Sequence, residues 1–436
     1  MEKMNSNARV KLWGSYIGAV SWLEDQEIGV FQYEPDFVRS GIQISPLTMP
    51  LVESSYAFPG LSKSTFSGLP GLLSDSLPDK FGNAVIETWL AMRGRAVNDF
   101  NPVERLCYTG NRGMGALEFE PAIMGPAQQS DYLEISGLVE LANQILNKRK
   151  EMKGFLAGEN DQKAIQDILR VGTSAGGARA KAILAWNPKT NEFRSGQIEQ
   201  DDGFEHWIMK FDGVSDHFFD SLADSGGYGK IEYAYYLMVK AAGIEMAECR
   251  LHNEGGRSHF MTRRFDRVAD SGKLHVQTLG ALAHYDYQLA ASYSYEQAVQ
   301  VIKRLNLPRE DMEQMIMRAA FNVFGRNNDD HVKNIAFLMN RKGEWRLAPA
   351  YDMTYAMNPS GKWTSKHQMS VNGKRENIER KDLYALAGFA DIKKRRAEQL
   401  IEKVLLSVSR WQEFAQIAGI DEERMAKIEK NLITEI

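Results

Sequence analysis

The chain has 436 residues, of which 43% are apolar and 25% charged, and its formal net charge is −4. The length predicts two domains or two large lobes, and the composition is that of a soluble globular protein with a sizeable core. The slight negative charge excludes a protein that binds nucleic acid over its whole surface, so any DNA contact needs a local basic patch.

Cys107 and Cys249 are the only cysteines, and they lie far apart in the sequence. This excludes a disulfide framework or a zinc site, and it favours a reducing cytoplasm. The first residues are polar, and no run approaches the roughly 18 apolar residues of a membrane span. We therefore expect a cytoplasmic protein that makes no membrane contact.

The first 150 residues predict strands and two helices. Residues 9–35 alternate between apolar and polar side chains, which is typical of strands. Residues 68–82, GLPGLLSDSLPDKFG, predict a shaped turn region before a helix over 84–94. A loop with a short strand is expected at 111–121, and residues 135–149 have helical periodicity.

The polar stretch 150–164 is expected to separate a first domain, 1–150, from a second, 151–436. Strands are predicted at 206–213 and 257–267, with a helix at 228–244 between them. From about residue 290 the periodicity is mostly helical. We therefore predict an α+β protein with two lobes, in which the second domain is strand-rich to about residue 265 and helical over about 266–436.

The densest polar run, NNDDHVKN, lies between a predicted helix and a predicted hairpin. The helix should end near Gly325, which we expect at its C′ position. The segments IAFLM, NRKGE and WRLAPAYDM then predict a strand, a turn and a returning strand. Because a hairpin returns the chain to where it began, Asp352 should lie close to Asp329 and Asn334.

This arrangement is what phosphoryl transfer requires, because that reaction depends on positioning and charge neutralisation. One Asp accepts the hydroxyl proton, while an Asn and a second Asp hold Mg²⁺ through oxygen ligands. In the kinase loop the Asn lies five residues after the base, a spacing that favours Asp329 over Asp330. His331 and Lys333 would flank the phosphates or orient the loop.

Two other readings of this loop stay open. Asn and Asp are common in turns, so NNDDH could be a solvated connection between a helix and a strand. A metal-dependent hydrolase could also use Asp and His ligands. That chemistry calls for His at metal-ligand spacing, whereas the eight His of this chain are scattered.

A nucleotide cradle is a candidate at residues 172–181, GTSAGGARAK. The stretch matches neither the Walker A pattern nor G-x-G-x-x-G. Its small residues would still let backbone N–H groups approach phosphates, although a flexible turn has the same composition. Lys210, in the strand HWIMKF, could contact the α- and β-phosphates with Glu232 as its partner, or could be an ordinary surface Lys.

Taken together, these segments resemble the HipA-like serine/threonine kinases, the toxins of bacterial toxin–antitoxin pairs. The resemblance runs from about residue 10 to about residue 400, and GLPGLLSDSLPDKFG resembles the signature of that family's N-terminal subdomain. The motifs that carry it in the second domain are SAGGARAK (174–181), IMKF (208–211), RRFDR (263–267), NDDHVKN (328–334) and LAPAYDM (347–353).

The resemblance implies a two-lobed kinase that uses ATP and Mg²⁺. Asp329 would be the base, Asn334 and Asp352 the metal ligands, and Arg263 the start of the hinge beside the adenine. The residues expected around the nucleotide are Gly176, Gly177, Ala178, Arg179, Ala180, Lys181, Lys210, Arg263, Arg264, Phe265, His331, Val332, Lys333, Asn334, Tyr351 and Asp352.

Ser174 matches the serine that this family autophosphorylates in trans, with Thr173 as a rival site. Phosphate there would add charge and eject the Gly-rich loop from the ATP site, which would switch the kinase off. The alternative is two small residues in a flexible loop.

The resemblance also implies partners: a small DNA-binding antitoxin (HipB-like), operator DNA, and a protein substrate such as an aminoacyl-tRNA synthetase or a translation factor. The basic stretch 360–381, with Lys374 and Arg375 as candidate DNA contacts, could touch phosphates or could be a solvated surface. A non-catalytic corepressor and a small-molecule kinase on the same fold are the alternative functions.

Overall fold

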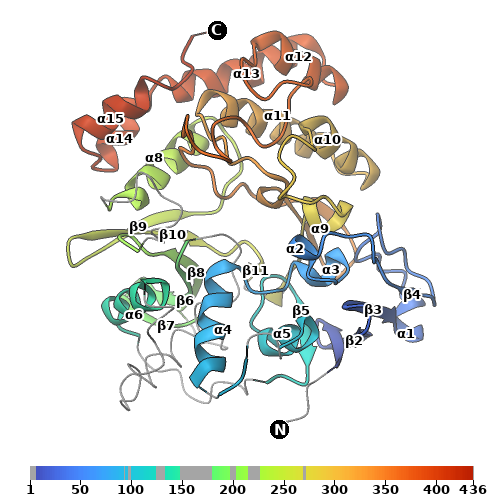
Figure 1. Ribbon diagram of the computed structural model, residues 1–436. Coiled ribbons are helices and arrows are strands. Elements are labelled where there is room, and N and C mark those ends of the chain that lie inside the picture. The colour runs from blue at the N-terminus through green and yellow to red at the C-terminus, as the bar shows by residue number, and fades with distance from the viewer. Residues whose placement is uncertain are drawn as a thin grey trace. The chain divides into compact units, whose positions relative to one another are not determined.

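The computed structural model describes residues 6–92, 94–96, 100–123, 133–147, 179–196, 203–214, 226–268 and 272–435. The chain forms two compact units (Figure 1). Unit 1 comprises Met1–Ile42, Leu51–Gly229 and Arg250–His275, and unit 2 comprises Gln43–Pro50, Lys230–Cys249 and Val276–Ile436. The boundary expected near residue 150 lies outside the described residues.

The first sheet of unit 1 confirms the strands expected at 9–35 and 111–121. Its order is β4-β3-β2-β1-β5, formed by β1 (Asn7–Leu12), β2 (Ser15–Leu23), β3 (Ile28–Tyr33), β4 (Ser55–Tyr56) and β5 (Leu117–Glu120). In β1, Ala8, Val10 and Leu12 are buried and alternate with outward-facing residues, which is the pattern of a half-buried strand.

Helices lie between the strands of this sheet in the sequence. Helix α1 (Pro35–Val38) separates β3 from β4, and β4 is separated from β5 by α2 (Lys63–Phe66), α3 (Gly71–Ser74), α4 (Lys80–Met92) and α5 (Pro102–Thr109). Helix α4 begins four residues before the expected Ala84. The reason is local: Asp79 Oδ1 accepts a hydrogen bond from the N–H of Gly82 at 2.7 Å. An Asp that accepts from the first turn stabilises a helix start.

A second sheet of unit 1 has the order β7-β6-β8-β10-β9. Its strands are β6 (Lys181–Asn187), β7 (Glu192–Ser195), β8 (Glu205–Lys210), β9 (Cys249–Glu254) and β10 (Arg257–Arg263), and the pair β11 (Arg267–Val268) and β12 (Gly272–Lys273) follows. Trp207 and Met261 of this sheet share one buried cluster with Trp89 of α4 and Leu138 of α6 (Ile135–Asn147). The N-terminal region and this sheet therefore have a common core.

Unit 2 is mostly helical, as the periodicity after residue 290 predicted. Its helices are α8 (Tyr228–Ala241), α9 (Leu279–Ala283), α10 (Tyr295–Arg304), α11 (Arg309–Phe324), α12 (Arg380–Phe389), α13 (Lys394–Val408), α14 (Trp411–Ile417) and α15 (Glu422–Glu429). Helix α11 packs against α10, α12 and α13. The strands β13 (His275–Thr278), β14 (Ala336–Met339) and β15 (Trp345–Leu347) form one sheet in that order.

These strand-rich and helix-rich parts give the α+β class that the sequence predicted. Within the described ranges, no helix has both the length and the apolar character that a membrane crossing requires.

Candidate active site

Helix α11 delivers the chain to the polar loop. The helix ends at Phe324, as expected, but Gly325 is its C-cap with φ −80°, and the left-handed residue is the next one, Arg326, with φ 53°. Gly325 is needed for space and not for its φ, because a Cβ there would lie 2.9 Å from Phe321 O and 3.3 Å from the Tyr235 ring. The Tyr235 hydroxyl donates to Gly325 O at 2.5 Å, which fixes the start of the loop.

The predicted hairpin exists, and α11 holds its returning strand. β14 and β15 pair antiparallel, with Phe337 opposite Leu347. The N–H of Leu347 donates to Asp311 Oδ2 at 2.9 Å, and Arg318 Nη2 donates to Ala348 O at 2.7 Å. These contacts fix the direction of the chain toward Asp352.

The return of Asp352 to the loop is confirmed. Asn327 Nδ2 donates to Asp352 O at 3.2 Å, and the Tyr351 hydroxyl donates to Lys333 O at 2.6 Å. Asp352 has φ 52°, in the left-handed region that few residues other than Gly adopt. Such strained backbone concentrates at functional sites.

Asn334 lies against Asp329. Residues Val332–Asn334 form a 3₁₀ turn, and Asn334 Nδ2 donates to Asp329 O at 2.8 Å. The amide nitrogen of Asn334 is thereby engaged, which leaves its Oδ1 as the side-chain atom suited to a cation. His331 Nε2 lies 4.0 Å from Asp329 Oδ1.

The two neighbouring acids of the loop have opposite environments. The Asp329 side chain is 50% exposed, whereas that of Asp330 is 1% exposed. Asp330 accepts hydrogen bonds from the Tyr295 hydroxyl and from the N–H of Gln368, at 2.9 and 2.7 Å, and its Oδ2 lies 3.0 Å from His367 Nδ1. Solvent can therefore reach the carboxylate of Asp329 but not that of Asp330. This agrees with the choice made from loop spacing.

Lys181 and Lys210 belong to unit 1. They are opposite each other in the antiparallel pairing of β6 with β8, so both side chains lie on one face of the sheet. Lys181 Nζ pairs with Asp79 Oδ2 at 3.1 Å, and both side chains are nearly inaccessible, at 4% and 6% exposed. Lys210 Nζ lies 5.7 Å from the centroid of the Phe260 ring.

The sequence did not indicate that Asp79 is the partner of Lys181. Asp79 belongs to GLPGLLSDSLPDKFG, which indicated only a turn. Nothing local in the sequence pairs it with Lys181, which lies 102 positions away.

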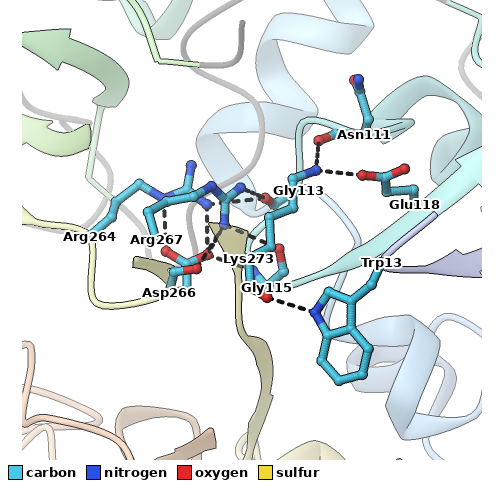
Figure 2. Close-up of polar contacts among 9 residues, drawn as sticks. All are labelled: Trp13, Asn111, Gly113, Gly115, Glu118, Arg264, Asp266, Arg267 and Lys273. Atoms are coloured by element: carbon cyan, nitrogen blue, oxygen red, sulfur yellow. Dashed lines mark hydrogen bonds and ion pairs between the residues drawn. The ribbon is translucent and has the colours of Figure 1, made fainter. Parts of the chain in front are cut away.

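The stretch RRFDR holds a buried ionic cluster (Figure 2). Arg264 donates to both oxygens of Asp266, at 2.9 and 2.7 Å, and to Gly113 O at 3.2 Å. The N–H of Gly115 also donates to Asp266, at 2.7 Å. Burial raises the pKa of Asp266, but the charges of Arg264 and Arg267 outweigh burial and leave this pKa far below its usual value.

This cluster joins the stretch 263–267 to the loop 113–115 within unit 1. Arg264 is fully buried in it, whereas the Arg263 side chain is half exposed and lies 3.3 Å from Glu205. The expected placement of both arginines beside an adenine stays a prediction. Asp266 was not singled out from the sequence, although an Asp between two Arg is a recognisable signal.

The remaining nucleotide candidates divide into two groups. Thr173, Ser174, Gly176, Gly177 and Ala178 lie outside the described residues. The Arg179 guanidinium lies 4.2 Å from the centroid of the Tyr228 ring, and Ala180 is fully buried, with its carbonyl accepting from the N–H of Phe211 at 3.0 Å.

In the basic stretch 360–381, both DNA candidates make internal contacts. Lys374 Nζ lies 2.8 Å from Asp382 and 3.6 Å from Glu379, and its hydrogen bond to Asp382 raises its pKa. Arg375 Nε donates to His367 O. Lys366 pairs with Glu376 at 2.6 Å. Contact with DNA stays a prediction for this stretch.

Two stretches of the chain match known domain families. Residues 8–120 match the HipA N-terminal domain, and residues 173–412, more than half of the chain, match the HipA-like C-terminal domain. A chain of the solved Shewanella oneidensis complex of HipA, HipB and operator DNA superposes with a TM-score of 0.67 at 18% identity. That match covers 97% of this chain and 95% of the other, and at this identity it shows the fold.

A curated protein of Sinorhizobium fredii, named "Putative kinase Y4mE", is 26% identical over 125 residues. The match spans 27% of this chain and 30% of that protein's length. With the α+β architecture and the two domain matches, the conclusion is plain: the chain has a HipA-like fold and belongs to the family of proteins with a HipA-like C-terminal domain.

Proposed function

We propose that this chain is an ATP- and Mg²⁺-dependent serine/threonine protein kinase that acts as the toxin of a toxin–antitoxin pair. The observation that carries the proposal is the pairing of Asn334 with exposed Asp329, beside Asp352 in a left-handed conformation. An accessible carboxylate, an amide oxygen and a second carboxylate are the side chains that phosphoryl transfer uses.

Each residue has a distinct role in this proposal. Asp329 accepts the proton of the attacking hydroxyl group, and the hydrogen bond from Asn334 to its carbonyl holds the loop in place. Asn334 and Asp352 would hold Mg²⁺, whose charge neutralises the nucleotide phosphates when it is bound. Their oxygen donors fit this hard cation, which needs only one or two protein carboxylates when phosphates complete its shell. Lys210 would bind the α- and β-phosphates.

The proposed partners follow the related complex, in which HipA is bound to HipB and operator DNA. We assign this chain a small HipB-like antitoxin, contact with operator DNA through that antitoxin, and a place in the cytoplasm. Its phosphoryl acceptors would be Ser174, as a self-inhibiting site, and an aminoacyl-tRNA synthetase or translation factor. A charged phosphate on the Gly-rich stretch would disturb nucleotide binding.

Labelled ATP and Mg²⁺ test the proposal directly. Purified protein is incubated with both, and the modified residues are mapped by mass spectrometry. Wild type should acquire label on Ser174 or Thr173, and Asp329→Ala should not. Asp391→Asn is the control, because Asp391 is an exposed acid that pairs with Lys303 and Asn tolerates its left-handed backbone, so this variant should label like wild type. Absence of label in an initially unphosphorylated, ATP-binding wild type would contradict autophosphorylation and favour a small-molecule kinase.

A further inference from the structure

The segment after Asp352 is tied to the loop that contains Asp329. Asn328 Nδ2 donates to Thr364 O at 2.9 Å, and Asp330 binds the side chain of His367 and the backbone N–H of Gln368. The two residues that flank Asp329 therefore hold the same short stretch, 364–368. This stretch is part of the connection between the returning hairpin and α12.

Asp330 is the centre of this tie. Burying a carboxylate is costly unless hydrogen bonds and nearby donors offset the loss of water. Three groups surround Asp330, from Tyr295, His367 and Gln368. The His367 side chain is buried, and its Nε2 has no hydrogen-bond partner among the described residues, so its hydrogen-bonding contact is the one to Asp330.

The same network extends to Asp352. Asn322 Nδ2 donates to the Tyr295 hydroxyl at 2.8 Å, and Asn327 Nδ2 donates to Asn322 Oδ1 at 3.0 Å. Asn327 Nδ2 also donates to Asp352 O. A continuous set of buried polar contacts thus joins the stretch 364–368, the loop and the end of the hairpin.

We propose that Asp330 is a positioning residue, which locks the stretch 364–368 to the loop and thereby fixes the exposed carboxylate of Asp329. Kinases that phosphorylation switches on order their activation loop with arginine–phosphate pairs. In this chain the Asp330 carboxylate orders the stretch 364–368, so this stretch needs no phosphate to be ordered. This inference rests on the proposed function, since it gives Asp329 a catalytic task.

The test combines hydrogen exchange with steady-state kinetics on the full chain. Asp330→Ala removes all three contacts, so amides 364–368 should exchange faster while those of α13 keep their protection. The kcat of phosphoryl transfer should fall about 100-fold, because a small displacement of a reacting group lowers the rate by about this factor. The KM for ATP should stay unchanged, because only the placement of Asp329 is altered.

Two further variants separate positioning from general destabilisation. Asp330→Asn keeps the side-chain volume and can still accept from Gln368, so its kcat and exchange should lie between those of wild type and Asp330→Ala. Tyr295→Phe removes one donor from the network but leaves both contacts to 364–368, so this stretch should stay protected.

The outcomes are distinguishable. Unchanged exchange at 364–368 in both Asp330 variants overturns the lock, whatever the kinetics. Faster exchange with a wild-type kcat overturns the positioning role while the proposed kinase stands. A wild type that transfers no phosphate overturns the proposed function, and with it the kinetic half of this inference.

Discussion

Lys181 and Lys210 face each other across the antiparallel pair β6 and β8, and Lys181 forms an ion pair with the buried carboxylate of Asp79. Like charges directly opposite on one face of a sheet repel each other. The Asp79 carboxylate offsets this repulsion at Lys181. Asp79, which stabilises Lys181 beside the candidate phosphate-binding Lys210, therefore comes from the N-terminal region of the chain.

Replacing Asp79 by Ala should strongly destabilise unit 1. The change leaves the Lys181 ammonium buried without the Asp79 carboxylate, which costs about 3–5 kcal/mol of unfolding free energy. It also removes the hydrogen bond that stabilises the start of α4. Urea unfolding measures this loss. The double variant Asp79→Leu with Lys181→Met should recover most of it, because apolar pairs often replace buried ion pairs at no cost. Glu27→Gln, which breaks the exposed pair with Lys63, is the control and should change nothing measurable. Equal stability of Asp79→Ala and wild type would contradict the role given to the pair.

The local features of the site could be predicted from the sequence. The helix that ends at Phe324, the hairpin after it and the return of Asp352 follow from apolar periodicity and turn residues, which act over short distances along the chain. The spacing of Asp329 and Asn334 sufficed to single out the exposed acid. These are features in which local chemistry and tertiary structure agree.

The long-range pairs could not be predicted in the same way. Asp79 with Lys181 and Asp330 with His367 are joined only by tertiary folding, and no periodicity records such a partner. The left-handed residue at the end of α11 was assigned to Gly325, yet Arg326 adopts it. Packing decides that case, because the neighbouring Phe321 carbonyl and Tyr235 ring leave no room for a Cβ at Gly325.

Two histidines of unit 1, the half-buried His206 and the buried His259, should make the protein sensitive to acid. Burial, reinforced by Arg264 and Arg267, lowers the pKa of His206 to about 4, and burial, reinforced by His252, lowers that of His259 to about 4. In the unfolded chain a His titrates near its ordinary value of about 6.5. Between pH 6.5 and 4 the unfolded state therefore binds more protons than the folded state, and stability falls as the pH falls.

His259→Gln tests this pH dependence. His259 Nδ1 accepts from the N–H of Asp212 at 2.9 Å, and a Gln oxygen can accept the same bond without titrating. The free energy of unfolding, measured by urea at several pH values, should fall less steeply in the variant below pH 6.5. A difference of one bound proton between the unfolded and folded states changes the unfolding free energy by about 1.4 kcal/mol per pH unit. In the middle of the range between pH 6.5 and 4, the slopes of variant and wild type should differ by about this amount. Parallel pH profiles for variant and wild type would contradict the depressed pKa of His259.

Gly325→Ala should be destabilising although its φ of −80° suits Ala. The added Cβ would lie 2.9 Å from a backbone oxygen, so the start of the loop must shift, and overpacking of this kind costs about 1–3 kcal/mol. Gly388→Ala is the matched control, because that Gly lies in α12 with no atom within 4 Å of its added Cβ. Thermal unfolding should show a lower Tm for the first variant and an equal or higher Tm for the second. The reverse order would show that Gly325 has spare room.

Asp352→Gly should separate activity from stability. The left-handed backbone is unfavourable for Asp but not for Gly, so the substitution removes this cost from the folded state. Gly also loses more conformational entropy than Asp on folding, which acts in the opposite direction. The unfolding free energy should therefore stay level or rise by up to about 1 kcal/mol, since the backbone carbonyl can still accept from Asn327. Loss of the carboxylate should abolish labelling by ATP and Mg²⁺, which the same assay measures. Asp352→Ala, which has neither the carboxylate nor the freedom of Gly, should be both inactive and less stable than wild type. If the Gly variant labelled normally, Asp352 would not be a metal ligand, and its left-handed backbone would serve the turn alone.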